Sequence, residues 1–363
     1  MSDLARQLLL ESVAAAFRTN SAMYRDMGSE LYGCLFAQAA DEPELVELAS
    51  HGQEGARPVH LLSAVHDLLL RGSSDPLARF FPTLSEDPAT PEAALPELLR
   101  FCVERRDEIL SILRTRTVQS TYVERCWSLM PALAHVAALA GEPLDLIEIG
   151  TSAGVLLTCD AHAYDVPGKG RVGPQHAPLT LTGRYEGNPP LGIPRIEKRI
   201  GIDLQPLDAA NADDRRWLLA LCLPELRDEQ ARLATALDVV AGTDMRLEKG
   251  DALERLPEML ALEDGPVCVF HSVCLLYWPQ AARAALDTLL CHESRARDIY
   301  RLGFELSADF DAVHAGRSAN ADAATRPPRA SFDVTCTCYR GGNADARVIA
   351  QMTPDFETLY WLG

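Results

Sequence analysis

The chain has 363 residues, of which 47% are hydrophobic, and its formal net charge at pH 7 is −18. This length exceeds what one core usually organises, so two packed units are expected. A negative field repels phosphate backbones and anionic membrane surfaces, which argues against nucleic acid and membranes as partners. We interpret the charge first of all as a solubility feature.

The cysteines and the N-terminus indicate a cytoplasmic protein. The ten cysteines show no CxxC pair and no spacing typical of a disulfide framework, so most are expected to be core residues in a reducing compartment. Cys336 and Cys338 alternate with threonines, which favours one face of a strand over a metal site, and no metal is expected. Residues 1–20 carry acids and lack a continuous apolar segment, so neither a signal peptide nor a transit peptide is expected.

Residues 1–141 show the periodicity of helices. Apolar residues recur every three and four positions in DLARQLLLESVAAAF, ARPVHLLSAVHDLLL, LPELLRFCVERRDEILSIL and YVERCWSLMPALAHVAALA. Breaks rich in Pro and Asp fall at 72–76 and 85–96. We therefore predict an all-helical N-terminal domain, 1–141, whose last helix ends at Gly141.

From residue 142 onward, short apolar runs alternate with helical patterns. The runs are LDLIEIG, RIGIDL, MRLEKGDA, VCVFHSV and IYRLGFEL. This alternation predicts an α/β domain over 142–363, with a mostly parallel, Rossmann-like sheet covered by helices on both faces. FDVTCTCYRGGNADARVIAQM predicts an antiparallel C-terminal β-hairpin that closes the sheet edge. Residues 165–198 form a Gly- and Pro-rich insertion, and residues 311–330 a long loop.

The first predicted strand runs into a sharp turn. LDLIEIGTSAGVLL places Glu148 near the strand end, Gly150 at the turn and Gly154 at the start of a helix. Glycine there lets the backbone pass close to a nucleoside or amino-acid moiety, and the helix offers N–H groups to an anion. The alternative is a turn whose glycines serve packing alone, because this pattern by itself is weak.

A second glycine motif does not have the context of a dinucleotide site. GKGRVG, residues 168–173, matches G-x-G-x-x-G, but it follows Pro167 rather than a strand, and Pro174 breaks any helix behind it. We predict a loop. Neither GxxxxGK[ST] nor GxSxG occurs, so no motif supports phosphoryl transfer or serine hydrolysis.

Two further acids lie at the ends of the next strands. RIGIDL places Asp203 where a carboxylate can accept both hydroxyls of a ribose, and EKGDA places Asp251 where it can accept from an adenine amino group. The alternative for each acid is a helix N-cap. Their common position along the sheet, together with Glu148, favours a nucleoside site.

These motifs resemble those of class I S-adenosylmethionine-dependent methyltransferases: EIGTSAG is similar to their first motif, and Asp203 and Asp251 match the acids that follow. Over its whole length the chain resembles the bacterial DUF2332 family, through VHLLSAVHDLLL, RIGIDLQPLD, VFHSVCLLYW and other segments. The resemblance implies a methyltransferase-like fold with a helical N-terminal lid and S-adenosylmethionine (SAM) as cofactor. The residues expected to bind the cofactor are Gln119, Glu148, Gly150, Ser152, Gly154, Asp203, Asp251 and Ser272.

The chain departs from the usual DUF2332 pattern in two places. QSTY, which ends at Tyr122, stands where QTNE is usual, and SAGVLL stands where SAGLNL is usual. The QSTY segment is expected to fold over the site with Tyr122 facing the ligand, because the face of a tyrosine attracts a sulfonium by about 0.5–2 kcal/mol. The alternative is a tyrosine that packs between domains.

The fourth predicted strand ends in a second pair of candidates. His271 and Ser272 lie where methyltransferases of this type place groups that contact the acceptor, and Tyr277 and Trp278 follow them as lining residues. His271 is suited to take a proton from an amine or hydroxyl; the alternative is a hydrogen-bonded core histidine. Tyr122 and His271 are therefore the candidate catalytic residues.

Three functions follow from these residues. The first is methyl transfer from SAM to a small nucleophile, which needs positioning and exclusion of water rather than a nucleophile motif. The second is cyclisation of SAM to azetidine-2-carboxylate with release of methylthioadenosine, because Thr121 and Tyr122 replace a family Asn and Glu. The third is a SAM-binding protein without turnover, because Ser152 replaces the middle glycine of the first motif. A homodimer is left open.

Overall fold

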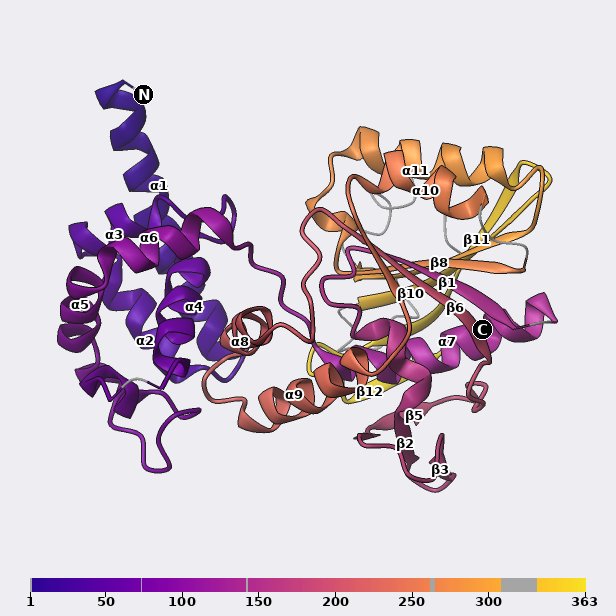
Figure 1. The fold of residues 1–363 in the computed structure, drawn as a ribbon, viewed down its shortest axis with the longest axis horizontal. Coiled ribbons are helices and arrows are strands. Elements are labelled where there is room, and N and C mark those ends of the chain that lie inside the picture. The colour runs from indigo at the N-terminus through magenta and orange to yellow at the C-terminus, as the bar shows by residue number, and fades with distance from the viewer. Residues whose placement is uncertain (1, 73, 142, 262–264, 308–331) are drawn as a thin grey trace. The chain divides into compact units, whose positions relative to one another are not determined.

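The computed structural model describes residues 2–72, 74–141, 143–261, 265–307 and 332–363, so the loop predicted at 311–330 lies outside the described residues. The chain divides into two compact units (Figure 1). Unit 1 comprises Met1–Thr121 and Ala210–Ala234, and unit 2 comprises Tyr122–Ala209 and Thr235–Gly363. Within the described ranges, no helix is both long enough and apolar enough to cross a membrane.

Unit 1 is built from helices, as the periodicity predicted. Its helices are α1 (Asp3–Asp26), α2 (Glu30–Ala39), α3 (Pro43–Ala49), α4 (Arg57–Leu70), α5 (Leu95–Glu104), α6 (Arg106–Thr115), α8 (Ala212–Ala220) and the first part of α9 (Arg227–Ala241), with short 3-10 helices η1 (Pro76–Phe80) and η2 (Pro91–Ala93). The segment LPELLRFCVERRDEILSIL, which has helical periodicity, forms two helices, α5 and α6. The chain leaves helical geometry at Arg105, where φ is −109° and ψ is 20°.

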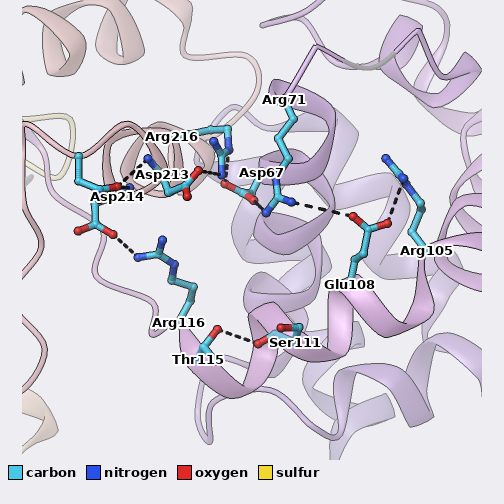
Figure 2. A network of polar contacts seen from close by, with 11 residues as sticks. Asp67, Arg71, Arg105, Glu108, Ser111, Thr115, Arg116, Asp213, Asp214 and Arg216 are labelled. Carbon is cyan, nitrogen blue, oxygen red and sulfur yellow. Dashed lines mark hydrogen bonds and ion pairs between the residues drawn. The ribbon is translucent and has the colours of Figure 1, made fainter.

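A network of ion pairs ties residues distant in sequence into unit 1 (Figure 2). Asp67 on α4 is buried and accepts from Arg216 Nε on α8 at 2.9 Å and from Arg71 Nη2 at 2.9 Å. Arg116, just after α6, pairs with Asp214 on α8. Because a buried carboxylate is stable only when it is paired, this network explains why Ala210–Ala234 belongs to the helical unit.

The boundary between the units differs from the one predicted at residues 141 and 142. Helix α7 (Cys126–Ala140) belongs to unit 2, where it packs against the strands of the sheet. Its apolar residues surround the helix on nearly all sides, and Trp127 and Met130 are fully buried. A helix of this kind needs cover on more than one face, and both the sheet and residues 156–161 pack against it. The role of the helical unit as a lid stays a prediction.

Unit 2 contains a nine-stranded, mostly parallel sheet, so the predicted α/β class with a mostly parallel sheet is confirmed. Its strand order is β5-β12-β11-β10-β9-β8-β1-β6-β7. The strands are β1 (Leu144–Ile149), β5 (Arg184–Glu186), β6 (Ile196–Asp203), β7 (Arg246–Lys249), β8 (Val267–Ser272), β9 (Ile299–Leu306), β10 (Phe332–Arg340), β11 (Asn343–Met352) and β12 (Thr358–Trp361). All five runs that we predicted as strands are strands.

The C-terminal hairpin forms, but it does not close the sheet. Strands β10 and β11 pair antiparallel, as predicted. β12 then pairs with β11, with Ala350 opposite Trp361, and β5 pairs with β12, so β5 lies at the edge. The expectation that the hairpin closes the edge was wrong. The last part of β11 is buried, so it needs a neighbouring strand to cover it.

Part of the 165–198 insertion, together with the residues just before it, forms a small second sheet, while β5 of the same insertion joins the large sheet. The strands of the small sheet, β2 (Ala163–Val166), β3 (Gly170–Val172) and β4 (Thr180–Thr182), are ordered β3-β2-β4. GKGRVG, which we predicted as a loop, therefore contains the short strand β3, which pairs antiparallel with β2. Within the described range 143–261, the next element after β3 is the strand β4 and not a helix, so the motif does not have the strand-turn-helix context of a dinucleotide site.

Helices cover both faces of the large sheet (Figure 1). α10 (Ala252–Ala261) and α11 (Gln280–Glu293) lie on one face, where Ile147 and Ile149 of β1 join their core, and α7 lies on the other. Because side chains alternate along a strand, Glu148 is directed to the face opposite its two isoleucine neighbours. The ten cysteines, each in the described ranges, are free thiols, and most of them are buried, as expected of core residues.

Candidate functional site

The turn after β1 has an unusual backbone. Gly150, Ser152 and Gly154 all have positive φ angles, of +75°, +54° and +83°. A Cβ atom on Gly150 would lie 2.5 Å from Cys274 Sγ, so a close approach as well as a left-handed conformation requires glycine there. The helix expected from Gly154 is instead the short 3-10 helix η4 (Leu156–Ala161), with a kink inside it. That expectation was wrong, and η4 is too short to offer an anion site.

Asp203 joins this turn to the ends of the two neighbouring strands. Its Oδ2 accepts from Ser152 N–H at 2.9 Å and its Oδ1 from Gln205 N–H at 2.8 Å. Its backbone carbonyl accepts from Gly250 N–H, which follows β7. The strand order reverses between β1 and β8, and ligands of α/β sheets bind at the carboxyl ends of strands beside such a reversal.

Asp251 has a structural role at the start of helix α10. The residue is exposed, and its Oδ1 accepts from Leu253 N–H at 2.8 Å, which caps the helix. This is the alternative that the sequence left open for acids at such boundaries. Contact with an adenine amino group stays a prediction for Asp251.

Glu148 is a buried carboxyl group with an altered acidity. Only 2% of the residue is exposed, and its Oε2 accepts from Thr151 Oγ1 at 2.7 Å. Burial raises the pKa of Glu148 to about 8, and the charge of Asp203 adds to the rise, while Thr151 and Arg125 lower it. Glu148 is therefore mostly protonated at neutral pH. A buried acid of this kind beside a strand-end turn is a typical feature of functional sites.

The pKa of Glu148 predicts a pH-dependent stability. In the unfolded chain the group ionises near 4.5, and in the folded protein near 8, so the unfolded state holds fewer protons between these values. The free energy of unfolding is therefore expected to fall as pH rises from about 4.5 to about 8. Glu148→Gln should abolish this decrease in the free energy of unfolding, which is on the order of a few kcal/mol. Urea denaturation at the two ends of this pH range measures the decrease, and the exposed Glu186→Gln, as the control, should retain it. Equal pH slopes in parent and Glu148→Gln would contradict the assignment.

His271 and Glu305 form a buried pair at the ends of β8 and β9. His271 Nδ1 lies 2.7 Å from Glu305 Oε1, which also accepts from the N–H groups of Cys274 and Leu275 at 3.1 Å each. Burial lowers the pKa of His271, so its imidazole is neutral at pH 7. Its Nε2 is buried and has no hydrogen-bond partner in the described part of the chain, beside Gly303.

Arg125 lies against two aromatic rings just before helix α7. Its guanidinium carbon is 5.5 Å from the centre of the Tyr122 ring and 5.9 Å from that of Phe356. The two rings are 5.7 Å apart. Its Nη1 donates to the Ser272 carbonyl over 3.5 Å. In this structure Tyr122 packs on a cation of the protein itself, Arg125, and its expected contact with a sulfonium stays a prediction.

A small cavity lies beside Arg125. Its volume is about 10 Å³, the space of about one water molecule, and it is partly open. Its polar lining residues are Arg125, Ser128, His271 and Ser272. Within the described ranges, Arg125 Nε and Ser272 Oγ are buried and have no hydrogen-bond partner. These polar atoms can bind a ligand group that brings its own donors or acceptors.

The structure thus brings most of the predicted residues together in unit 2. Glu148, Gly150, Ser152, Gly154 and Asp203 surround one turn. His271 and Ser272 line the cavity, and Tyr122 packs on Arg125. Gln119 belongs to unit 1, and its cofactor contact stays a prediction.

Two residues of the site were missed. Glu305 is the second-last residue of the apolar run IYRLGFEL, and an acid near a strand end is the same signal that singled out Glu148. Arg125 gave no such signal, because arginines before a helix are common.

Comparison with protein families assigns this chain. The family model described as "Uncharacterized protein conserved in bacteria (DUF2332)" matches residues 14–361. The chain belongs to the DUF2332 family. None of the curated proteins matches it. The match covers both units of the DUF2332 chain, including all the site residues described above.

Proposed function

We propose that this DUF2332 protein is a SAM-dependent enzyme that transfers a methyl group to a small nucleophile. Its fold would combine a Rossmann-like unit of the class I methyltransferase type with a helical N-terminal domain. The strand order β7-β6-β1-β8-β9-β10 supports the fold, because it corresponds to the 3-2-1-4-5-6 order of doubly wound nucleotide-binding sheets. The last of these strands runs antiparallel to β9.

The observation that carries the proposal is the link between Asp203 and the turn after β1. The two oxygens of a carboxylate offer about four acceptor sites, so Asp203 can accept from a ribose as well as from the N–H groups of Ser152 and Gln205. The side chain is half-buried, so solvent reaches it. Gly150 and Gly154 let Cys274 and Met245 pack closely against the turn, so they support its shape rather than open space for a ligand. The carboxylate of Asp203 is therefore the group that fits a nucleoside.

The other residues of the site would act on the opposite end of the ligand. Bound SAM supplies a carbon on a positively charged sulfur: its methyl carbon in transfer, leaving S-adenosylhomocysteine, or its own Cγ in cyclisation, leaving methylthioadenosine and azetidine-2-carboxylate. The neutral His271, oriented by Glu305, would take the proton of the attacking amine or hydroxyl through a water in the cavity. Tyr122 would exclude bulk water.

Cyclisation is the second candidate, and the QSTY segment favours it, because Thr121 and Tyr122 stand where Asn and Glu are usual in the family. The cavity beside Arg125 holds about one water molecule, so its size does not distinguish the two reactions. A SAM-binding protein without turnover is the third candidate.

Calorimetry with SAM and with S-adenosylhomocysteine tests the proposal. We expect Asp203→Ala to weaken binding of both by about 10- to 100-fold, because hydrogen bonds to a charged group contribute about 1.5–3 kcal/mol. The exposed Asp165→Ala on β2 is the matched control, and thermal melts confirm that each variant is folded. If the parent protein binds neither compound, the proposal is wrong; unchanged binding by Asp203→Ala would remove the ribose assignment alone.

Incubation with SAM alone separates the reactions. Methylthioadenosine formed without an acceptor indicates cyclisation. S-adenosylhomocysteine formed only after an acceptor is added indicates methyl transfer. If the protein binds SAM but forms neither product with any of a panel of small amines and alcohols as acceptors, it is a SAM-binding protein without turnover.

A further inference from the structure

Arg125 is a cation that no described carboxylate contacts directly. The hydrogen bond found for it among the described residues is the long one to the Ser272 carbonyl, and its Nε is buried without a partner. Burial lowers the pKa of Arg125, which reflects the cost of removing its charge from water. A buried charge of this kind is unfavourable unless an anion offsets it. The rings of Tyr122 and Phe356 and the nearby charge of Glu305 offset only part of this cost, because the pKa of Arg125 is lowered all the same.

Two further features beside Arg125 favour an anion. Ser272 Oγ is buried, has no partner in the described part of the chain and belongs to the lining of the same cavity. Ser128, in the first turn of α7, lines it too, and the N-terminus of a helix carries a partial positive charge. A hydroxyl donor, a guanidinium and a helix N-terminus therefore surround one small space.

The size of this space limits how much of an anion enters it. A volume near that of one water molecule admits one oxygen of a carboxylate, while the rest of the ligand stays outside. Arginine also pairs well with carboxylates because its donors lie in one plane.

We propose that Arg125 and Ser272 bind the carboxylate of a small carboxylic acid at this cavity. The inference rests on the proposed function, which offers two sources of the group: the methionine end of SAM, or a separate acceptor that is itself a carboxylic acid. The chemistry at Arg125 is the same for both.

Binding measurements with two nucleosides test the first source. S-adenosylhomocysteine carries the amino-acid end and methylthioadenosine lacks it. If the carboxylate comes from the cofactor, Arg125→Gln is expected to weaken S-adenosylhomocysteine binding by about 10- to 100-fold and to leave methylthioadenosine binding unchanged. Ser272→Ala should also weaken S-adenosylhomocysteine binding without affecting methylthioadenosine binding, by a smaller factor. This variant tests the carboxylate site if Arg125→Gln does not fold. The exposed Arg171→Gln on β3 is the matched control.

Thermal melts with a mixture of the proteinogenic L-amino acids, at saturating S-adenosylhomocysteine, test the second source. If the amino acids stabilise the parent protein but not Arg125→Gln or Ser272→Ala, and the nucleoside affinities of the variants are unchanged, the carboxylate belongs to the acceptor. If folded variants change neither measurement, the inference is overturned and Arg125 only balances the charge of Glu305. If the parent binds no nucleoside, the proposed function fails by itself. In that case the amino-acid mixture is tested without a nucleoside. If it does not stabilise the parent protein either, the inference about Arg125 is also overturned.

Discussion

Replacement of Glu305 by alanine is expected to lower the free energy of unfolding by about 3–5 kcal/mol. One oxygen of this buried carboxylate accepts from His271 Nδ1 and from the N–H groups of Cys274 and Leu275. Alanine leaves three buried donors without this acceptor, and an unsatisfied buried donor costs about 1–3 kcal/mol. The midpoint of urea denaturation measures the loss, provided that the slope of the transition is unchanged.

Two variants bracket the result for Glu305. Glu305→Gln retains one acceptor oxygen of nearly the same shape, so its loss should be clearly smaller than that of Glu305→Ala. Glu197→Ala removes an exposed acid on β6 and should change stability by about 0.5 kcal/mol or less. A Glu305→Ala protein as stable as Glu197→Ala would show that the three hydrogen bonds contribute nothing. The turn from 273 to 275, which packs against Gly150, would then need another explanation.

Gly150→Ala is expected to destabilise the protein by about 2–4 kcal/mol and to weaken nucleoside binding with it. Two effects add. The φ angle of +75° disfavours any residue with a Cβ atom, and the new Cβ would lie 2.5 Å from Cys274 Sγ. Because both strand-end turns shift when this contact is relieved, Ser152 and Asp203 would lose their alignment. Urea denaturation and calorimetry with S-adenosylhomocysteine measure the two losses.

A control glycine and a double variant separate these two effects. Gly141 has nearly the same φ, +74°, with nothing within 4 Å of a Cβ atom, so Gly141→Ala should show the backbone strain alone. Cys274→Ala removes the sulfur that Gly150→Ala would meet, and the double variant is expected to recover the steric part of the loss. Equal losses for Gly150→Ala and Gly141→Ala would mean that the approach of Cys274 does not require glycine.

The sequence predicted best what depends on neighbours along the chain. Each predicted strand of unit 2 is an apolar run, and the positive φ of Gly150 follows from the sharp turn that EIGTSAG indicated. The sequence also placed Asp203 correctly at the end of β6, beside that turn. It failed where a helix required support from elsewhere: the residues after Gly154 form only a short 3-10 helix, because the chain turns at once toward the inserted sheet.

The allocation of residues to the two units could not be predicted from periodicity. Helix α7 has the same helical pattern as the segments before it, yet it packs on the sheet, because it is apolar on nearly all sides. Conversely, α8 follows a strand of the sheet in sequence but belongs to the helical unit, where Arg216 neutralises the buried Asp67. Periodicity shows that a helix forms, and the partners of its side chains decide where it lies.

By itself the sequence determined the order of strands and helices, the glycine turn and the acids at the strand ends, because each of these depends on local patterns of polarity and backbone conformation. Only the tertiary structure decided which side chains meet. Arg125, Ser272 and Phe356 lie far apart in the chain and surround one place because β8, the start of α7 and the segment before β12 converge there. Burial raises the pKa of Glu148 and leaves Arg125 Nε without a partner among the described residues, and burial results from packing that no short pattern encodes.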